Sequence, residues 1–381
     1  MKDCIDDRYF DVVCQEISDK ILEPYKMCWN KEHRRDLAYH MAKIGFAKAF
    51  VNCYKRVLHA EQIQHYTGAE ENFSNDRLLC LLRDTAWRLI SGSKKLAYKF
   101  GQVGFISMML EDLRVITPRM KDQQTRKAIL SALAILYHCG KADSNKLYFR
   151  EGRATAVLLY YVQSSHPEIK TAAILTLAHI MDEGEVLKLM NDPMVIRYII
   201  KVIEKALLVK SHRADGYSCL ELVEGLTALA LNDEMKRTLV QNGVLPSLTS
   251  LLEIGDAMEK EAAIKALWTL AFHRENRQKL LEEPKLMPLL ETLEKSSDAE
   301  EKMAAQRALF VIKEEQIVKG GQERMAKKAI KRKRSVERLR NRLRRRKSFR
   351  KALSTRLEDI GSNLADEGGR ETPRRTFPNN T

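Results

Sequence analysis

Residues 262–267 read Ala-Ala-Ile-Lys-Ala-Leu, and this short helical stretch decides the fold because related stretches recur along the chain. The copies end on six leucines, which are separated by 44, 44, 49, 41 and 42 residues. These anchor leucines are Leu89, Leu133, Leu177, Leu226, Leu267 and Leu309. From about residue 75 to 315, apolar residues recur three and four positions apart, as in amphipathic helices. A repeat of this length predicts units of two or three helices.

One such unit cannot bury its own apolar face, so neighbouring units stack and share a continuous core. Small residues such as alanine beside the anchors favour close approach of neighbouring helices. We therefore expect an all-α, armadillo-type α-solenoid, a right-handed superhelix of about six to seven repeats, with a basic helix at its C-terminal end. An irregular helical bundle is the alternative.

The composition divides the chain into four parts. We assign 1–70 to an N-terminal helical cap or incomplete repeat, 71–318 to the solenoid, 319–364 to a basic amphipathic helical tail and 365–381 to a disordered terminus. We expect a polar loop over 61–76. Glycine or proline precedes several apolar helices, and we assign these residues to junctions between second and third helices. They are Gly104, Gly152, Gly243, Pro193 and Pro284.

Three strings go beyond the general repeat pattern. They span Leu175–Glu183, Glu221–Asp233 and Ala266–Phe272. Together they resemble the armadillo region of invertebrate proteins that join armadillo repeats to a TIR domain. The resemblance implies a cytosolic interaction module in signalling, including innate immune signalling. The residues after 315 lack the alternating strands and helices of a TIR domain, so TIR chemistry does not carry over.

The residues two places before each anchor leucine should face the concave groove of such a solenoid. They are Trp87, Ser131, Leu175, Glu224, Lys265 and Arg307. Importin-like cargo receptors carry a Trp there and an Asn two places after the anchor, and this chain matches only one of those twelve positions. No charge sign dominates the six residues, which disfavours a nucleic-acid groove and suits a protein partner. Ordinary solvated positions are the alternative.

The net charge of +15 is concentrated in one segment. Residues 324–356 hold 17 Lys or Arg and one acid, whereas the other 49 basic and 50 acidic residues nearly cancel. The segment has two basic clusters, and apolar residues recur at helical spacing from Val336 to Leu364. The clusters are Lys331, Arg332, Lys333 and Arg334, and Arg344, Arg345, Arg346 and Lys347.

Several partners suit a basic amphipathic helix. They are an importin that reads a nuclear signal, an anionic membrane, a calmodulin-type protein, and RNA or the ribosome. A solvated tail is the alternative. Ser335, Ser348 and Thr376 follow basic residues and are candidate phosphorylation sites, where phosphate would cancel nearby positive charge.

Signals of catalysis are absent from the sequence. There is no GxxxxGK[ST] phosphate loop, GxSxG elbow or HExxH motif. We interpret the glycines of 101–104 as a turn between helices, and Cys139 at a helix C-terminus as a thiol that is not activated. We expect no enzyme activity, cofactor, metal or small-molecule substrate.

The acidic start of the chain and the scattered cysteines favour a cytoplasmic protein, with nuclear entry as an alternative. We therefore predict a non-enzymatic scaffold that binds a protein partner in its groove and uses the basic tail for targeting. The alternatives are a nucleic-acid-associated protein and a regulator of TIR-type signalling.

Overall fold

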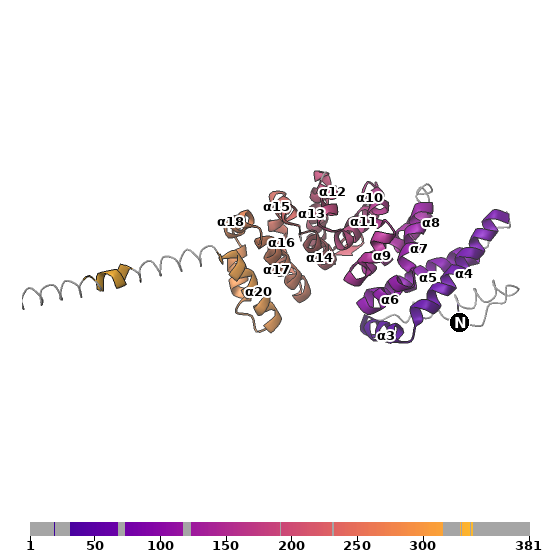
Figure 1. Ribbon diagram of the computed structural model, residues 1–381, viewed down its shortest axis with the longest axis horizontal. Coiled ribbons are helices and arrows are strands. Elements are labelled where there is room, and N and C mark those ends of the chain that lie inside the picture. Colours follow the sequence, from indigo (N-terminus) through magenta and orange to yellow (C-terminus); the bar gives the residue numbers. More distant parts are fainter. Residues whose placement is uncertain are drawn as a thin grey trace, which may run out of the picture. The chain divides into compact units, whose positions relative to one another are not determined.

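The computed structural model describes residue 19, residues 31–67, 73–116, 123–190, 192–230 and 232–314, and residues 328, 330–335 and 337. The described helices up to residue 312 form six successive groups of three, which follow one another in chain order (Figure 1). The first three groups are α3 (Lys31–Lys43), α4 (Phe46–Thr67) and α5 (Phe73–Gly92); α6 (Lys94–Gln102), α7 (Phe105–Ile116) and α8 (Gln123–Gly140); and α9 (Lys146–Glu151), α10 (Ala154–Val162) and α11 (Pro167–Ile180). The last three are α12 (Glu183–Met190), α13 (Pro193–Leu207) and α14 (Cys219–Leu229); α15 (Asp233–Gln241), α16 (Val244–Ile254) and α17 (Ala257–Ala271); and α18 (Arg274–Glu282), α19 (Leu286–Leu293) and α20 (Ala299–Ile312). We call these groups repeats 1 to 6.

The predicted all-α solenoid is confirmed. Each anchor leucine lies on the third helix of its repeat, and all six are at most 6% exposed. Each third helix packs against the third helix of the next repeat, from α5 to α20. The buried apolar side chains of all six repeats form one cluster, as expected for units that cannot fold alone.

The anchor spacing of 49 residues has a clear structural cause. Repeat 4 contains an inserted β-hairpin between α13 and α14, formed by β1 (Arg213–Ala214) and β2 (Tyr217–Ser218). Asp215 and Gly216 connect the strands with φ angles of 49° and 86°. Positive φ at both central residues is typical of a type I′ turn, for which Asp-Gly is a preferred sequence.

Two predicted boundaries were wrong. α4 continues to Thr67 and α5 begins at Phe73, so most of the predicted loop over 61–76 is helical. Polar residues there are compatible with helix because one face of a surface helix is solvated. The predicted division at residue 70 falls inside repeat 1, since α3 and α4 both pack against α5. Repeat 1 is therefore complete.

The glycine and proline junctions were assigned to the wrong helix pair. Gly104 and Gly243 lie between the first and second helices of their repeats, where φ is +82° and +84°. At the equivalent turn of repeat 3 it is Arg153 that takes positive φ, at 49°. At Gly152 the neighbouring space is tight for another reason: a Cβ would lie 2.6 Å from Cδ1 of Leu110, which would then have to shift.

Two buried asparagines tie neighbouring repeats together. Nδ2 of Asn145 donates to the carbonyl oxygens of Ala97 and Cys139 at 3.1 and 3.0 Å. Nδ2 of Asn276 donates to those of Lys236 and Leu270 at 3.0 and 3.1 Å. Each asparagine thus joins the first-helix region of its own repeat to the first and third helices of the preceding one.

The chain after Ile312 forms a second unit, and most of it lies outside the described residues. Within it, Ile330–Ser335 are helical and exposed. The cluster at residues 344–347 and the candidate phosphorylation sites Ser348 and Thr376 lie outside the described residues, as do residues 365–381.

Candidate protein-interaction groove

The six predicted groove residues lie at equivalent places on the third helices, but their exposure differs. Trp87, Ser131 and Glu224 are half-buried, and Lys265 and Arg307 are exposed. The prediction for Leu175 was wrong, because this side chain is 1% exposed. It lies against Gly225 of the next third helix, where a Cβ would come within 2.4 Å of Cδ2 of Leu175. Leu175 is therefore part of the packing between α11 and α14.

Contacts within the chain engage several side chains of the central third helices. Lys141, which follows α8, places its Nζ 2.5 Å from Oε2 of Glu224 on α14 and 5.4 Å from the ring centroid of Tyr137. This ion pair joins repeats 2 and 4 and uses the carboxylate that was predicted to face a partner. The Tyr217 ring from the hairpin lies 5.6 Å from Tyr137 in an edge-to-face arrangement, which is favourable for aromatic rings.

Side-chain contacts hold the hairpin region against helices of the preceding and the following repeats. Oδ2 of Asp215 accepts hydrogen bonds from the hydroxyls of Tyr198, at 2.8 Å, and Thr171, at 3.2 Å. Nδ1 of His212 lies 2.7 Å from Oε2 of Glu259 on α17. These contacts connect the insertion in repeat 4 to repeats 3 and 5, so the hairpin is a structural part of the centre of the solenoid.

The His179 ring also lies next to Tyr137, with 5.5 Å between the two ring centroids. Its Nε2 and the Tyr137 hydroxyl are buried without a hydrogen-bond partner in the described structure. Burial, with added repulsion from Lys141, Lys94 and Lys146 and a smaller opposing effect of Asp143, lowers the pKa of His179 to about 4. The imidazole is therefore neutral in the folded protein at neutral pH.

We expect stability to fall as His179 is titrated. Its pKa is lower in the folded than in the unfolded state, so protons bind preferentially to the unfolded chain as the pH falls from about 6.5 towards about 4. The linked loss in the free energy of unfolding should reach about 2 kcal/mol at pH 5 relative to pH 8. Urea unfolding of wild type and His179→Leu at both pH values measures it. Equal pH dependence in the two proteins would contradict the prediction, because the other titrating groups are shared.

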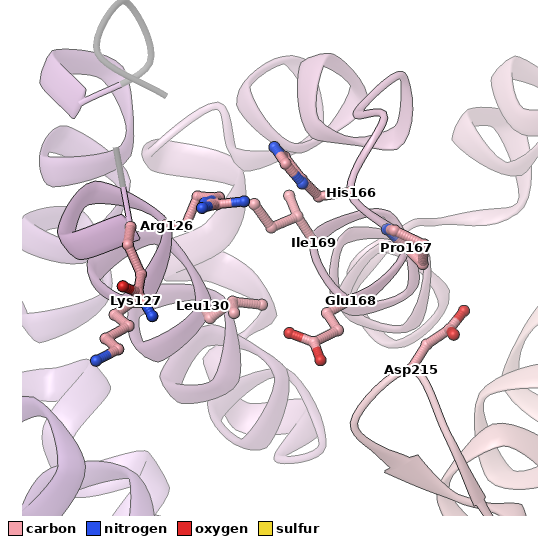
Figure 2. Close-up of a pocket in the computed structure, with 9 residues that line it drawn as sticks. Arg126, Lys127, Leu130, His166, Pro167, Glu168, Ile169 and Asp215 are labelled. Atoms are coloured by element: carbon pink, nitrogen blue, oxygen red, sulfur yellow. The ribbon is translucent and has the colours of Figure 1, made fainter. Parts of the chain in front are cut away.

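A pocket of about 520 Å³ lies between the N-terminal halves of α8 and α11, with the hairpin as a further wall (Figure 2). Arg126 and Lys127 line it from α8, and Glu168 lines it from α11. Asp215 completes the lining, with its carboxylate already hydrogen-bonded to Tyr198 and Thr171. Arg126, Lys127 and Glu168 form no ion pair among the described residues. The pocket therefore presents both charge signs.

Nothing in the described chain suggests catalysis. Among the described residues, no group of three or more His, Cys, Asp or Glu side chains is arranged to hold a metal ion. Burial raises the pKa of the Cys139 thiol to about 12, so this thiol is not a nucleophile at neutral pH. The 101–104 stretch ends α6 and turns into α7, in agreement with its interpretation as a turn. No described helix is long and apolar enough to cross a membrane.

No protein-family model and no curated protein matches the chain. A solved engineered protein superposes with a TM-score of 0.50 at 19% identity, covering 80% of this chain and 71% of the other. The three-helix repeats, stacked through their third helices, have the fold of an armadillo-type solenoid. A designed armadillo repeat protein gives a TM-score of 0.47 at 20% identity, covering 62% of this chain and 94% of that one. Another, solved in complex with the peptide (KR)4, gives 0.46 at 20% identity, covering 63% and 95%. At these identities the likeness concerns the fold alone.

Proposed function

We propose that this armadillo-type protein is a non-enzymatic scaffold that holds a protein partner on the exposed surface of its third helices. One observation carries the proposal: the anchor leucines of repeats 5 and 6 are buried, whereas Lys265 and Arg307, two places earlier on the same helices, are exposed. A stacked solenoid is ordered before it binds, so association costs little conformational entropy.

The basic segment would serve as an electrostatic tether. Lys331, Arg332, Lys333 and Arg334 are all exposed on a short helical stretch, which favours contact with an importin, another acidic protein or an anionic membrane. Association with RNA through the same four cations is the second candidate function, since consecutive exposed cations also attract phosphates. A role in TIR-type signalling stays a prediction from the resemblance of the repeats.

Site-specific photo-crosslinking of the full chain in cell extract tests the scaffold proposal. A photoreactive residue replaces Ser131, Lys265 or Arg307 on a third helix, and Lys48 or Lys201 on an exposed part of a second helix serves as the matched control. We expect one protein partner to be captured from third-helix positions at least about fivefold more efficiently than from the controls. The capture should persist when Lys331, Arg332, Lys333 and Arg334 are all changed to Glu. Equal capture from both sets, or loss of capture with the tail variant, would overturn the proposal.

A further inference from the structure

The third helices of repeats 5 and 6 carry cations without an acidic partner. Lys265 on α17 and Arg307 on α20 are exposed, and neither forms an ion pair among the described residues. Nη2 of Arg307 lies 3.4 Å from the sulfur of Met303. The helices α17 and α20 pack side by side (Figure 1). Lys265 and Arg307 hold equivalent positions on them, each two residues before its anchor leucine.

Exposed apolar side chains lie at helical spacing of three, four or seven residues from the two cations. Phe272 and Phe310 are 52% and 62% exposed, and Met258 and Met303 are 55% and 48% exposed. The half-buried Trp268 ring lies 5.1 Å from Phe272, which extends the aromatic surface along α17. Exposed apolar groups gathered on two adjacent helices indicate an interaction site more strongly than the same number scattered singly.

The equivalent places in repeats 3 and 4 already have partners within the chain. Leu175 is buried against Gly225, and Glu224 pairs with Lys141. Tyr217 of the hairpin covers Tyr137 of repeat 2. A partner would have to displace these contacts in the centre, whereas it would meet solvated side chains on repeats 5 and 6.

We propose that the third helices of repeats 5 and 6 bind an extended partner segment in which acidic and bulky apolar residues alternate; this rests on the proposed scaffold function. Alternate side chains of an extended chain point to opposite sides. One row can therefore meet Lys265 and Arg307 while the other meets Phe272 and Phe310. Neighbouring helices pack roughly 8–10 Å apart. Residues two apart in an extended chain are separated by roughly 7 Å. The long side chains of Lys265 and Arg307 can span the difference.

Nearby acidic residues restrict where the acidic residues of the partner can lie along α17 and α20. Glu261 is four residues before Lys265 on α17, and Glu300 is seven residues before Arg307 on α20; both are exposed. Acidic residues of a partner are disfavoured beside them. Acidic residues of the partner should therefore lie beside Lys265 and Arg307 rather than beside Glu261 or Glu300.

Binding of a fluorescent peptide to the full-length chain tests the proposal. The probe is a short peptide in which Glu alternates with Leu and Phe, with two comparison peptides that carry Lys for Glu or Ser for Leu and Phe. The variant Lys265→Glu/Arg307→Glu is compared with Lys48→Glu/Lys201→Glu, which changes the net charge equally at exposed second-helix positions and keeps the same basic tail. A third variant, Met303→Ser/Phe310→Ser, removes apolar contacts from exposed positions.

We expect the groove variant Lys265→Glu/Arg307→Glu to weaken binding of the acidic probe about tenfold, with the second-helix control within about twofold of wild type. Met303→Ser/Phe310→Ser should weaken it comparably, and both comparison peptides should bind at least about tenfold more weakly than the probe. Equal weakening by the two charge-reversal variants would show that the basic tail binds the probe and would overturn the proposal. If the probe does not bind while third-helix crosslinks to a partner persist, this inference is wrong and the scaffold function stands. If those crosslinks are also lost, both proposals are wrong.

Discussion

Replacing Asp112 with alanine is expected to lower the free energy of unfolding by about 3–5 kcal/mol. Asp112 on α7 is 8% exposed, and its Oδ2 lies 2.8 Å from Nη2 of Arg83 on α5, which is 6% exposed. The Tyr54 hydroxyl on α4 donates to the same oxygen at 2.8 Å and accepts from Nε of Arg83 at 2.8 Å. Burial raises the pKa of Tyr54 well above its usual value, so the phenol stays protonated. Without Asp112, the Arg83 charge stays buried with no counter-charge, in the centre of repeats 1 and 2.

Chemical denaturation followed by circular dichroism measures the loss, which should appear in the first unfolding transition if the repeats unfold in stages. Asp84→Ala is the control, because Asp84 is also on α5 but forms a half-buried pair with Arg88 at 3.0 Å. That change should cost less than about 1 kcal/mol. The double variant Arg83→Met/Asp112→Leu removes both charges and should recover most of the stability. If the double variant is as unstable as Asp112→Ala, the cost comes from lost packing and the explanation by an unpaired charge is wrong.

The repeat architecture could be predicted because a stack of similar units needs a buried apolar side chain at the same place in each. Leu177 and Leu267 satisfy this requirement with 0% exposure, and a leucine at regular intervals is visible in the sequence. The hairpin was missed because its strands have only two residues each and show no alternating pattern. The longer spacing between Leu177 and Leu226, together with Asp215-Gly216, could have indicated it.

The hydrogen bonds of Asn145 and Asn276 to the preceding repeat were missed because these asparagines do not recur in every repeat. Asn276 follows its anchor Leu267 by nine residues, and the same place holds Val186 and Met235 in repeats 4 and 5. Asn145 follows Leu133 by twelve residues, because a 3-10 turn over Asp143–Asn145 precedes α9. A search for residues that recur at a fixed position in the repeat therefore finds neither asparagine.

The exposure of the six predicted groove residues could be predicted only in part, because it depends on the neighbouring repeat. Leu175 is buried since its neighbour in the next third helix is Gly225, which leaves room for the leucine side chain. Lys265 remains exposed at the equivalent place. Similarly, Glu224 pairs with a lysine 83 residues away, a contact that no local pattern encodes. Position within the repeat indicates which side chains can reach the groove, but the facing repeat determines which of them remain available.

Gly101→Ala should be the second most damaging substitution, with an expected loss of about 2–4 kcal/mol in the free energy of unfolding. Gly101 is buried near the end of α6, and a Cβ there would lie 2.2 Å from Oδ1 and 2.8 Å from Cγ of Asn145. The asparagine cannot move away freely, because its Nδ2 is held by the carbonyl oxygens of Ala97 and Cys139. The added methyl group therefore breaks two buried hydrogen bonds between repeats 2 and 3.

A double-mutant cycle separates this mechanism from general overpacking of α6. Asn145→Ala alone should cost about 1–3 kcal/mol, because the two carbonyl oxygens lose their donor. In that background Gly101→Ala should add less than about 1 kcal/mol, since the methyl group then fills the space that the amide has left. Chemical denaturation of the four proteins gives the coupling directly. Additive losses would mean that the ring of Tyr148, whose Cδ2 would lie 3.0 Å from the new Cβ, resists the substitution instead. Non-additive losses would establish that glycine is required at 101 because the hydrogen-bonded side chain of Asn145 lies against α6 at this position.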